Sequence, residues 1–229
     1  MFEALSIDFN RPVPLFPLAG CVLLPHATIP LNIFEPRYRK MTRDALDGPG
    51  LIATAMFEGD EWKHNYHGNP PVREHVCVGH IVRHDKLHDG RYHIMLHGVC
   101  RARIEEEIEH DPYRLVQLDP VDTNPPFELD YEYDRDQLSE LLDDPDLKRL
   151  AAVGAMQNWM SKQLPTAAMV DLAVMVLCND PNARYDMLAE PELHARADWL
   201  RNYLEQTRAT LRLADKLGDS QSEDGYHLN

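Results

Sequence analysis

Histidines are the first side chains to test for chemistry, because the chain has twelve of them and imidazole both binds metals and transfers protons near neutral pH. His84 and His88 lie four residues apart, as do His93 and His97. Two imidazoles with a carboxylate would form a zinc or iron site. The first pair, however, falls in a predicted hairpin loop, and the second would lie about 13 Å apart along a strand. We therefore predict no bound metal and no cofactor.

Residues for nucleophilic catalysis or ATP hydrolysis are not arranged in a known pattern. None of the six lysines follows a glycine, as a phosphate-binding loop would require. Only Ser161 adjoins a lysine, Lys162, and neighbouring side chains on a helix point in different directions. No serine sits in a G-x-S-x-G turn. We predict that the chain is not an enzyme.

A long polar stretch over 58–75 contains two aromatic residues, Trp62 and Tyr66, and follows Phe57. Long loops in compact domains are often functional, and aromatic side chains make good binding anchors because they bury a large area with few rotatable bonds. These three residues are candidate peptide-binding residues. An alternative of equal weight is that Trp62 folds back as a lid on the sheet.

The elements that would position these residues change in type along the chain. Alternating or short apolar runs predict strands in the first half, and Pro36 suits the first turn of a single helix over 36–46. The dipeptide Asp89-Gly90 predicts a hairpin turn. The strands are expected at 13–18, 21–24, 28–33, 51–57, 76–83, 92–99, 101–108 and 113–119.

The second half of the sequence predicts a helical bundle after a stiff joint at Asn124-Pro125-Pro126. The segment 166–178 is apolar nearly all round, so we expect a central helix with Thr166 as its N-cap and with Leu172 and Val176 fully buried. Apolar residues four and three apart favour a long last helix. Helices are expected at 134–142, 147–163, 166–178 and 191–217.

These elements predict an α+β protein with three parts, namely a β-rich lobe over 1–122, a helical bundle over 123–217 and a disordered polar tail over 218–229. The 38 acidic and 23 basic residues give a formal charge of −15, which argues against nucleic acid or an anionic membrane as partner. Four scattered cysteines and the absence of an apolar leader or span favour the reducing cytoplasm.

Several motifs resemble the Lon protease N-terminal domain, also called the Lon substrate-binding domain. They are P-L-F-P-L from Pro14, V-L-L-P-H from Val22, I-P-L-N-I-F-E-P-R-Y-R-K-M from Ile29, D-G-R-Y from Asp89, G-V-C-R-A-R-I from Gly98 and, more weakly, M-L-A-E-P-E-L-H-A-R-A-D-W-L from Met187. The resemblance covers about residues 12–217. It implies a PUA-like β pseudo-barrel followed by a helical bundle, here in a stand-alone member without the ATPase and peptidase domains.

The resemblance also implies a function, which is to bind polypeptide segments or a protein partner, including unfolded or degron-bearing chains. We expect structural roles for the charged and aromatic residues of its motifs, with Glu35 in an ion pair at the helix start and Arg101 or Arg103 reaching it across strands. The oligomeric state is left open. The alternative from another class is RNA binding, because PUA-like barrels can bind RNA, and an enzyme of unknown type is a weaker one. The motif residues are Phe34, Glu35, Pro36, Arg37, Tyr38, Arg101 and Arg103.

Overall fold

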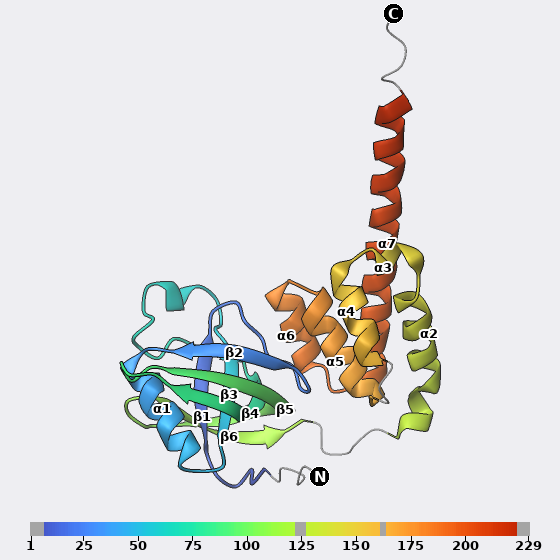
Figure 1. Ribbon diagram of the computed structural model, residues 1–229. Helices are drawn as coiled ribbons and strands as arrows, with labels where there is room; N and C mark the ends of the chain where they lie inside the picture. The colour runs from blue at the N-terminus through green and yellow to red at the C-terminus, as the bar shows by residue number, and fades with distance from the viewer. Residues whose placement is uncertain (1–6, 122–126, 161–163, 224–229) are drawn as a thin grey trace, which may run out of the picture. The chain divides into compact units, whose positions relative to one another are not determined.

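The computed structural model describes residues 7–121, 127–160 and 164–223 (Figure 1). Contacts within the chain divide it into two compact units. The first, here called the strand unit, comprises Met1–Pro125 together with Cys178–Pro191, and the second, the helical unit, comprises Pro126–Leu177 and Glu192–Asn229. The α+β class predicted from the sequence is confirmed, with strands in the first half and most helices in the second (Figure 1).

The strand unit is built on one mixed six-stranded sheet in the order β2-β5-β4-β3-β1-β6. The pair β1–β3 is parallel and the other pairs are antiparallel. The sheet curls until β6 pairs with both β1 and the end of β5, but β2 stays an edge strand, so the fold is a pseudo-barrel and not a closed barrel. The strands are β1 (Val13–Leu18), β2 (Thr28–Ile33), β3 (Leu51–Met56), β4 (His75–Lys86), β5 (Tyr92–Ile108) and β6 (Arg114–Pro120).

Small and β-branched apolar side chains fill the interior of this sheet, as expected for strands that bury one face. Two details differ from the sequence-based prediction. The segment 21–24, whose residues Val22, Leu23 and Leu24 are buried, is not a strand, and the chain turns just after it at His26, whose φ is 66°. The two strands predicted at 92–99 and 101–108 are the single strand β5, which passes through Gly98 without a turn. The main core cluster is Val13, Leu15, Leu51, Ala53, Ala55, Val76, Val78, Ala102, Val116 and Leu118.

The one helix predicted among the strands is confirmed with the same ends, as α1 (Pro36–Leu46). Pro36 occupies its first turn, and Tyr38 and Met41 lie on its buried face. The helix packs against β1, β2 and β3. The predicted turn at Asp89-Gly90 is also present, with Gly90 at a φ of 82° that favours glycine. The loop after β3 contains the short 3-10 helix η1 (Glu61–Lys63).

A helix that the sequence analysis missed, α6 (Pro181–Ala189), packs on the strand unit and not in the helical bundle. The backbone N–H of His75 donates to the Tyr185 hydroxyl at 3.1 Å. Arg73 donates to Asn182 at 2.8 Å and also lies over the Tyr185 ring. The second half of the sequence therefore contributes to both units. The predicted boundary between 122 and 123 lies outside the described residues.

The helical unit has the expected helices with some changes at their ends. The helix predicted over 147–163 is two helices, and its last three residues lie outside the described ones. The last helix continues to Glu223, six residues into the predicted tail, whose remaining residues 224–229 are not described. The elements are the 3-10 helix η2 (Glu128–Tyr131), α2 (Glu132–Leu142), α3 (Pro145–Lys148), α4 (Ala151–Met160), α5 (Thr166–Leu177) and α7 (Leu193–Glu223).

Two expectations about α5 and the bundle core were wrong. Leu172 and Val176 are half-buried and not fully buried, because a helix that is apolar all round does not reveal which side faces the core. The buried side of α5 instead includes Val170, Ala173 and Val174. Leu193, Ala197, Leu200 and Leu204 of the predicted α7 seam are buried. Among the helices in the described ranges, none is long and apolar enough to cross a membrane.

Candidate functional site

The aromatic residues of the 58–75 loop form a cluster against the end of β3. The Trp62 ring stacks on the Phe57 ring with centroids 5.4 Å apart and planes 11° apart. The Tyr66 ring meets Phe57 edge-on at 6.1 Å. Phe57 is only 4% exposed, so it forms the floor of the cluster, whereas Trp62 and Tyr66 are half-buried and each keeps part of its surface open to solvent. The loop thus combines the two interpretations that the sequence left open.

A polar network ties this loop to the start of α1. The Tyr66 hydroxyl donates to Glu35 Oε1 at 2.6 Å. Arg37 Nε donates to Glu35 Oε2, and its Nη2 donates to the Tyr66 carbonyl oxygen, both at 3.1 Å. The Arg37 guanidinium also lies 5.0 Å from the centre of the Tyr66 ring. Burial is the main cause that raises the pKa of Tyr66, and the hydrogen bond to Glu35 is the second. The phenol therefore stays a neutral hydrogen-bond donor at physiological pH.

The cation that pairs with Glu35 is a neighbour within the motif and does not come from strand β5. The ion pair at the helix start exists, and its cation is Arg37 from the same motif. The contacts described next for Arg101 and Arg103 are with other residues, although the sequence had suggested that both could reach Glu35 across strands. Arg103 lies 3.6 Å from Asp119 on the neighbouring strand β6. Arg101 is fully buried and donates to the carbonyl oxygen of Met187 at the end of α6, at 3.3 Å. Since α6 was not predicted, this contact had no counterpart in the sequence analysis.

The aromatic residues on either side of Glu35 have opposite environments. Tyr38 is buried and meets the Phe16 ring edge-on at 4.6 Å, and burial raises its pKa. That Tyr38 has a structural role stays a prediction. Phe34 is 60% exposed, so its side chain is open to solvent.

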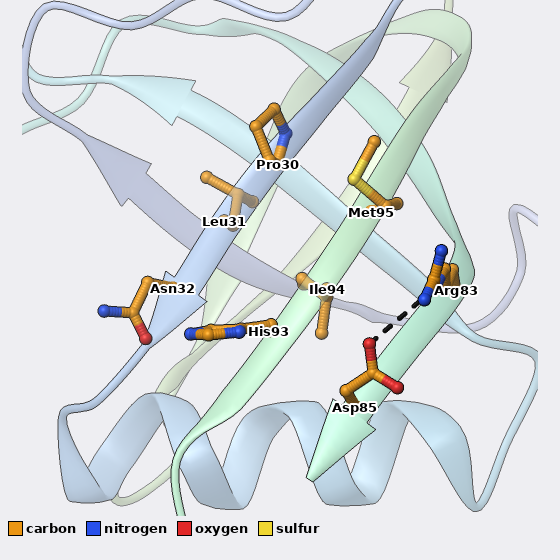
Figure 2. Close-up of a pocket in the computed structure, with 8 residues that line it drawn as sticks. All are labelled: Pro30, Leu31, Asn32, Arg83, Asp85, His93, Ile94 and Met95. Atoms are coloured by element: carbon orange, nitrogen blue, oxygen red, sulfur yellow. Dashed lines mark ion pairs between the residues drawn. The ribbon is translucent and has the colours of Figure 1, made fainter. Parts of the chain in front are cut away.

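An open hollow of about 390 Å³ lies on the face of the sheet formed by β2, β5 and β4, and Figure 2 shows its lining. The register aligns Asn32, His93 and Asp85 in one row across the three strands. Asp85 forms an ion pair with Arg83 at 3.7 Å. These groups can form hydrogen bonds, and the described lining contains no serine, cysteine or lysine that would act as a nucleophile. The lining residues are Pro30, Leu31, Asn32, Arg83, Asp85, His93, Ile94 and Met95.

A second hollow in the strand unit, of about 560 Å³, lies between the end of α1 and strands β1 and β6. The Tyr113 hydroxyl at its edge donates to Asp44 Oδ2 at 2.9 Å. Burial and this hydrogen bond raise the pKa of Tyr113 to about 12. Lys40 contacts the same carboxylate at 2.6 Å. The polar groups at this edge are thus paired with one another.

The histidine pairs that opened the sequence analysis do not form a cluster. His97 lies in β5 within 3.1 Å of the Thr28 hydroxyl, and His93 belongs to the row of Figure 2. Over the described part of the chain, no group of three or more His, Cys, Asp or Glu side chains is placed to hold a metal ion. None of the four cysteines, all of which lie in the described residues, is part of a disulfide. That the chain has no cofactor stays a prediction.

Comparison with known proteins places this geometry in a family. A profile of the ATP-dependent protease La (LON) substrate-binding domain matches residues 12–206, which is most of the chain. The chain belongs to the Lon substrate-binding domain family. It is 23% identical over 216 residues to a Lon protease of Desulfosudis oleivorans, an alignment that covers 93% of this chain and 26% of that protease. It is 32% identical over 125 residues to a Lon protease of Chloroflexus aggregans, covering 51% and 14%.

Solved structures of Lon N-terminal domains share the fold. The N-terminal domain of the Mycobacterium avium complex Lon protease aligns with a TM-score of 0.66 and 13% identity, over 85% of this chain and 98% of that one. A Lon N-terminal domain protein from Xanthomonas campestris aligns with a TM-score of 0.58 and 21% identity, over 83% and 96%. The chain spans about a quarter of the length of the first curated Lon protease, so the Lon-type domain is the part that the two share.

Proposed function

We propose that this Lon-type domain is a non-catalytic module that binds unfolded or degron-bearing polypeptide segments. The observation that carries the proposal is the match to the Lon substrate-binding domain over residues 12–206. The hollows of the strand unit support it, because the described residues that line them offer hydrogen bonds and ion pairs without an activated nucleophile. Cysteines that form no disulfide are consistent with action in the cytoplasm, which we include in the proposal.

We propose that Trp62 and Tyr66 contact the bound segment through their open faces, with Phe57 as the buried support. Both rings are held before a ligand arrives, Trp62 by stacking on Phe57 and Tyr66 by its bond to Glu35. Anchors that are already ordered lose little conformational entropy on binding, which favours affinity. An aromatic anchor of this kind typically contributes about 2 kcal/mol, or about thirtyfold in affinity.

The charge of the protein indicates which segments bind best. At a formal −15, the surface attracts basic segments and repels acidic ones, while the aromatic rings bury apolar side chains. Segments that combine lysine or arginine with large apolar residues are therefore the preferred ligands. The same charge opposes RNA, whose phosphates need a cationic surface. Filter binding to RNA at low salt should accordingly show no salt-sensitive complex.

The test is a fluorescence anisotropy titration of the full chain with a labelled, unstructured 15-residue peptide rich in lysine, leucine and phenylalanine. The Trp62→Ala variant should bind at least tenfold more weakly at a temperature well below its melting point. Phe34→Ala, which removes an exposed aromatic ring from the same unit, is the matched control and should bind within twofold of the wild type. No binding by the wild type would overturn the proposed function. Normal binding by Trp62→Ala would remove the loop from the site.

A further inference from the structure

The three most exposed large apolar side chains in the described part of the chain lie within seven residues at the beginning of the helical unit. They are Phe127, Tyr133 and Leu129, which are 71%, 69% and 68% exposed. Leu129 lies in η2 and Tyr133 in the first turn of α2, directly after it. A concentration of apolar surface of this kind marks an interaction site more often than isolated apolar residues do.

The backbone beneath these side chains is fixed by the residues between them. The Glu128 carboxylate accepts hydrogen bonds from the backbone N–H of Thr166 at 3.0 Å and from its hydroxyl at 2.8 Å. Thr166 is the first residue of α5, so Glu128 satisfies a free N–H at a helix start, where a carboxylate is favoured. The sequence had suggested Thr166 itself as this cap. Glu128 thereby attaches η2 to α5.

A second attachment joins the same segment to α7. The Tyr131 ring lies 4.4 Å from the His194 ring, and His194 Nδ1 is 2.6 Å from Asp134 Oδ2. Asp134 is buried and Tyr131 is half-buried, so these two residues lie against α7. Between Phe127 and Tyr133 the chain therefore uses Glu128 and Tyr131 to hold itself in place, while the three apolar side chains point to solvent. Their exposure is a property of an anchored segment.

The charge around these side chains restricts the kind of partner. Residues 127–136 contain five carboxylates and only one basic residue, Arg135. Four of the carboxylates are exposed like the apolar groups, and of these Asp130, Glu132 and Asp136 are not needed to hold the segment as Glu128 is. A partner with apolar side chains and positive charge would bury the first and pair with the second, whereas an acidic partner would be repelled. A basic polypeptide segment with large apolar residues has this chemistry.

We infer that Phe127, Leu129 and Tyr133 form a docking surface for basic, apolar polypeptide segments, and we call these three residues the apolar platform. The inference rests on the proposed function and extends it, because it gives the helical unit its own contact with the polypeptide. The carboxylates steer the segment to the platform, and the three side chains bury its apolar residues. Because the platform is already ordered, little conformational entropy is lost in the complex.

The experiment compares two labelled 15-residue peptides that share their leucines and phenylalanines and differ only in carrying lysine or glutamate at the charged positions. The full-length triple variant Phe127→Ala, Leu129→Ala, Tyr133→Ala should bind the lysine peptide at least tenfold more weakly than the wild type. Leu213→Ala is the matched control, because Leu213 is also exposed in the helical unit, and it should bind like the wild type. The wild type should prefer the lysine peptide at least tenfold at low salt, with a smaller preference at high salt.

The outcomes separate this inference from the proposed function. Tight binding of the lysine peptide by the wild type and by the triple variant alike would overturn the apolar platform and leave polypeptide binding intact. Equal affinity of the wild type for the lysine and glutamate peptides would overturn the charge selectivity. If the wild type binds neither peptide, the proposed function itself fails. Circular dichroism melting of the triple variant checks its fold, and Tyr133→Ala alone, expected to weaken binding about threefold or more, repeats the test with a smaller change.

Discussion

The aromatic loop of the strand unit and the apolar platform of the helical unit use similar residues in opposite ways. In the loop, Trp62 stacks on buried Phe57, and Tyr66 bonds to Glu35, so the rings themselves hold the segment in place. In the platform, Glu128 and Tyr131 hold the segment, and the neighbouring apolar side chains stay exposed. Where the aromatic rings hold their own segment in place, part of their surface is buried. Where other residues hold the segment, the apolar side chains stay more exposed and more of their surface can contact a ligand.

The largest expected effect on stability comes from comparing one glycine of the strand unit, Gly98, with one glycine of the helical unit, Gly154. A methyl group at Gly98 would overlap the carbonyl oxygen of Leu24 and stand 3.0 Å from Cys77 Sγ, and Gly98 is hydrogen-bonded to both His26 and Ala27. Gly98→Ala should therefore cost about 3 kcal/mol of unfolding free energy. At Gly154 in α4, no described atom lies within 4 Å of the added methyl group, so Gly154→Ala should stabilise the protein by about 0.5–1 kcal/mol. Denaturant titration measures both, and equal stabilities would show that β5 does not pack as closely as we describe.

The next largest effect compares the stability lost when the Trp62 ring and the Phe127 ring are removed. Trp62→Ala removes a ring that stacks on a core residue and should cost about 2 kcal/mol of unfolding free energy. Phe127→Ala removes an exposed ring and should change stability by less than about 0.5 kcal/mol. The same denaturant titration gives both values. If Phe127→Ala proved as costly as Trp62→Ala, the contrast between an anchoring ring and an open one would be wrong.

A smaller effect tests whether the polar groups of the strand unit serve its structure. Burial and Asp44 raise the pKa of Tyr113 to about 12, above the value of about 10 for an unperturbed tyrosine. The folded state therefore favours the neutral phenol, and its contribution to stability is complete below about pH 10 and lost as the pH rises towards 12. Tyr113→Phe should cost about 1 kcal/mol at pH 8 and should flatten the loss of stability above pH 10. A wild type and a variant with parallel pH profiles would contradict this role.

Local patterns in the sequence predicted those parts of the fold that depend on residues close together in the chain, such as helix starts and turns. Pro36 and the apolar spacing after it gave α1 with its correct ends, and Asp89-Gly90 gave the β4–β5 turn. The helix α6 was missed because it is short and follows the apolar α5 closely. Its docking depends on contacts such as His75–Tyr185, which are 110 residues apart in the sequence. No local pattern contains that information.

The two candidate binding sites differed in how much of each could be predicted from the sequence. Trp62 and Tyr66 stand out in the sequence because they interrupt a long polar stretch, but the Tyr66–Glu35 bond joins residues 31 positions apart and was not foreseen. The platform residues fell between the predicted joint at 124–126 and the predicted helix from 134, in a stretch to which no element had been assigned. The alternation of apolar and acidic residues from Phe127 to Asp134 was a visible signal there. It could not show which side chains face the bundle, because that depends on Thr166 and His194.

The central claim is that the apolar platform contacts the bound polypeptide. Photo-cross-linking tests this most directly, because it reports which positions of the protein touch the peptide. Benzoylphenylalanine would replace Tyr133 in one sample and Leu213, an exposed residue of α7, in another, and each full-length protein would be irradiated with the lysine peptide. We predict a covalent peptide adduct at position 133, suppressed by excess unlabelled peptide, and none above background at position 213. The absence of an adduct at 133, or equal labelling at both positions, would contradict the account.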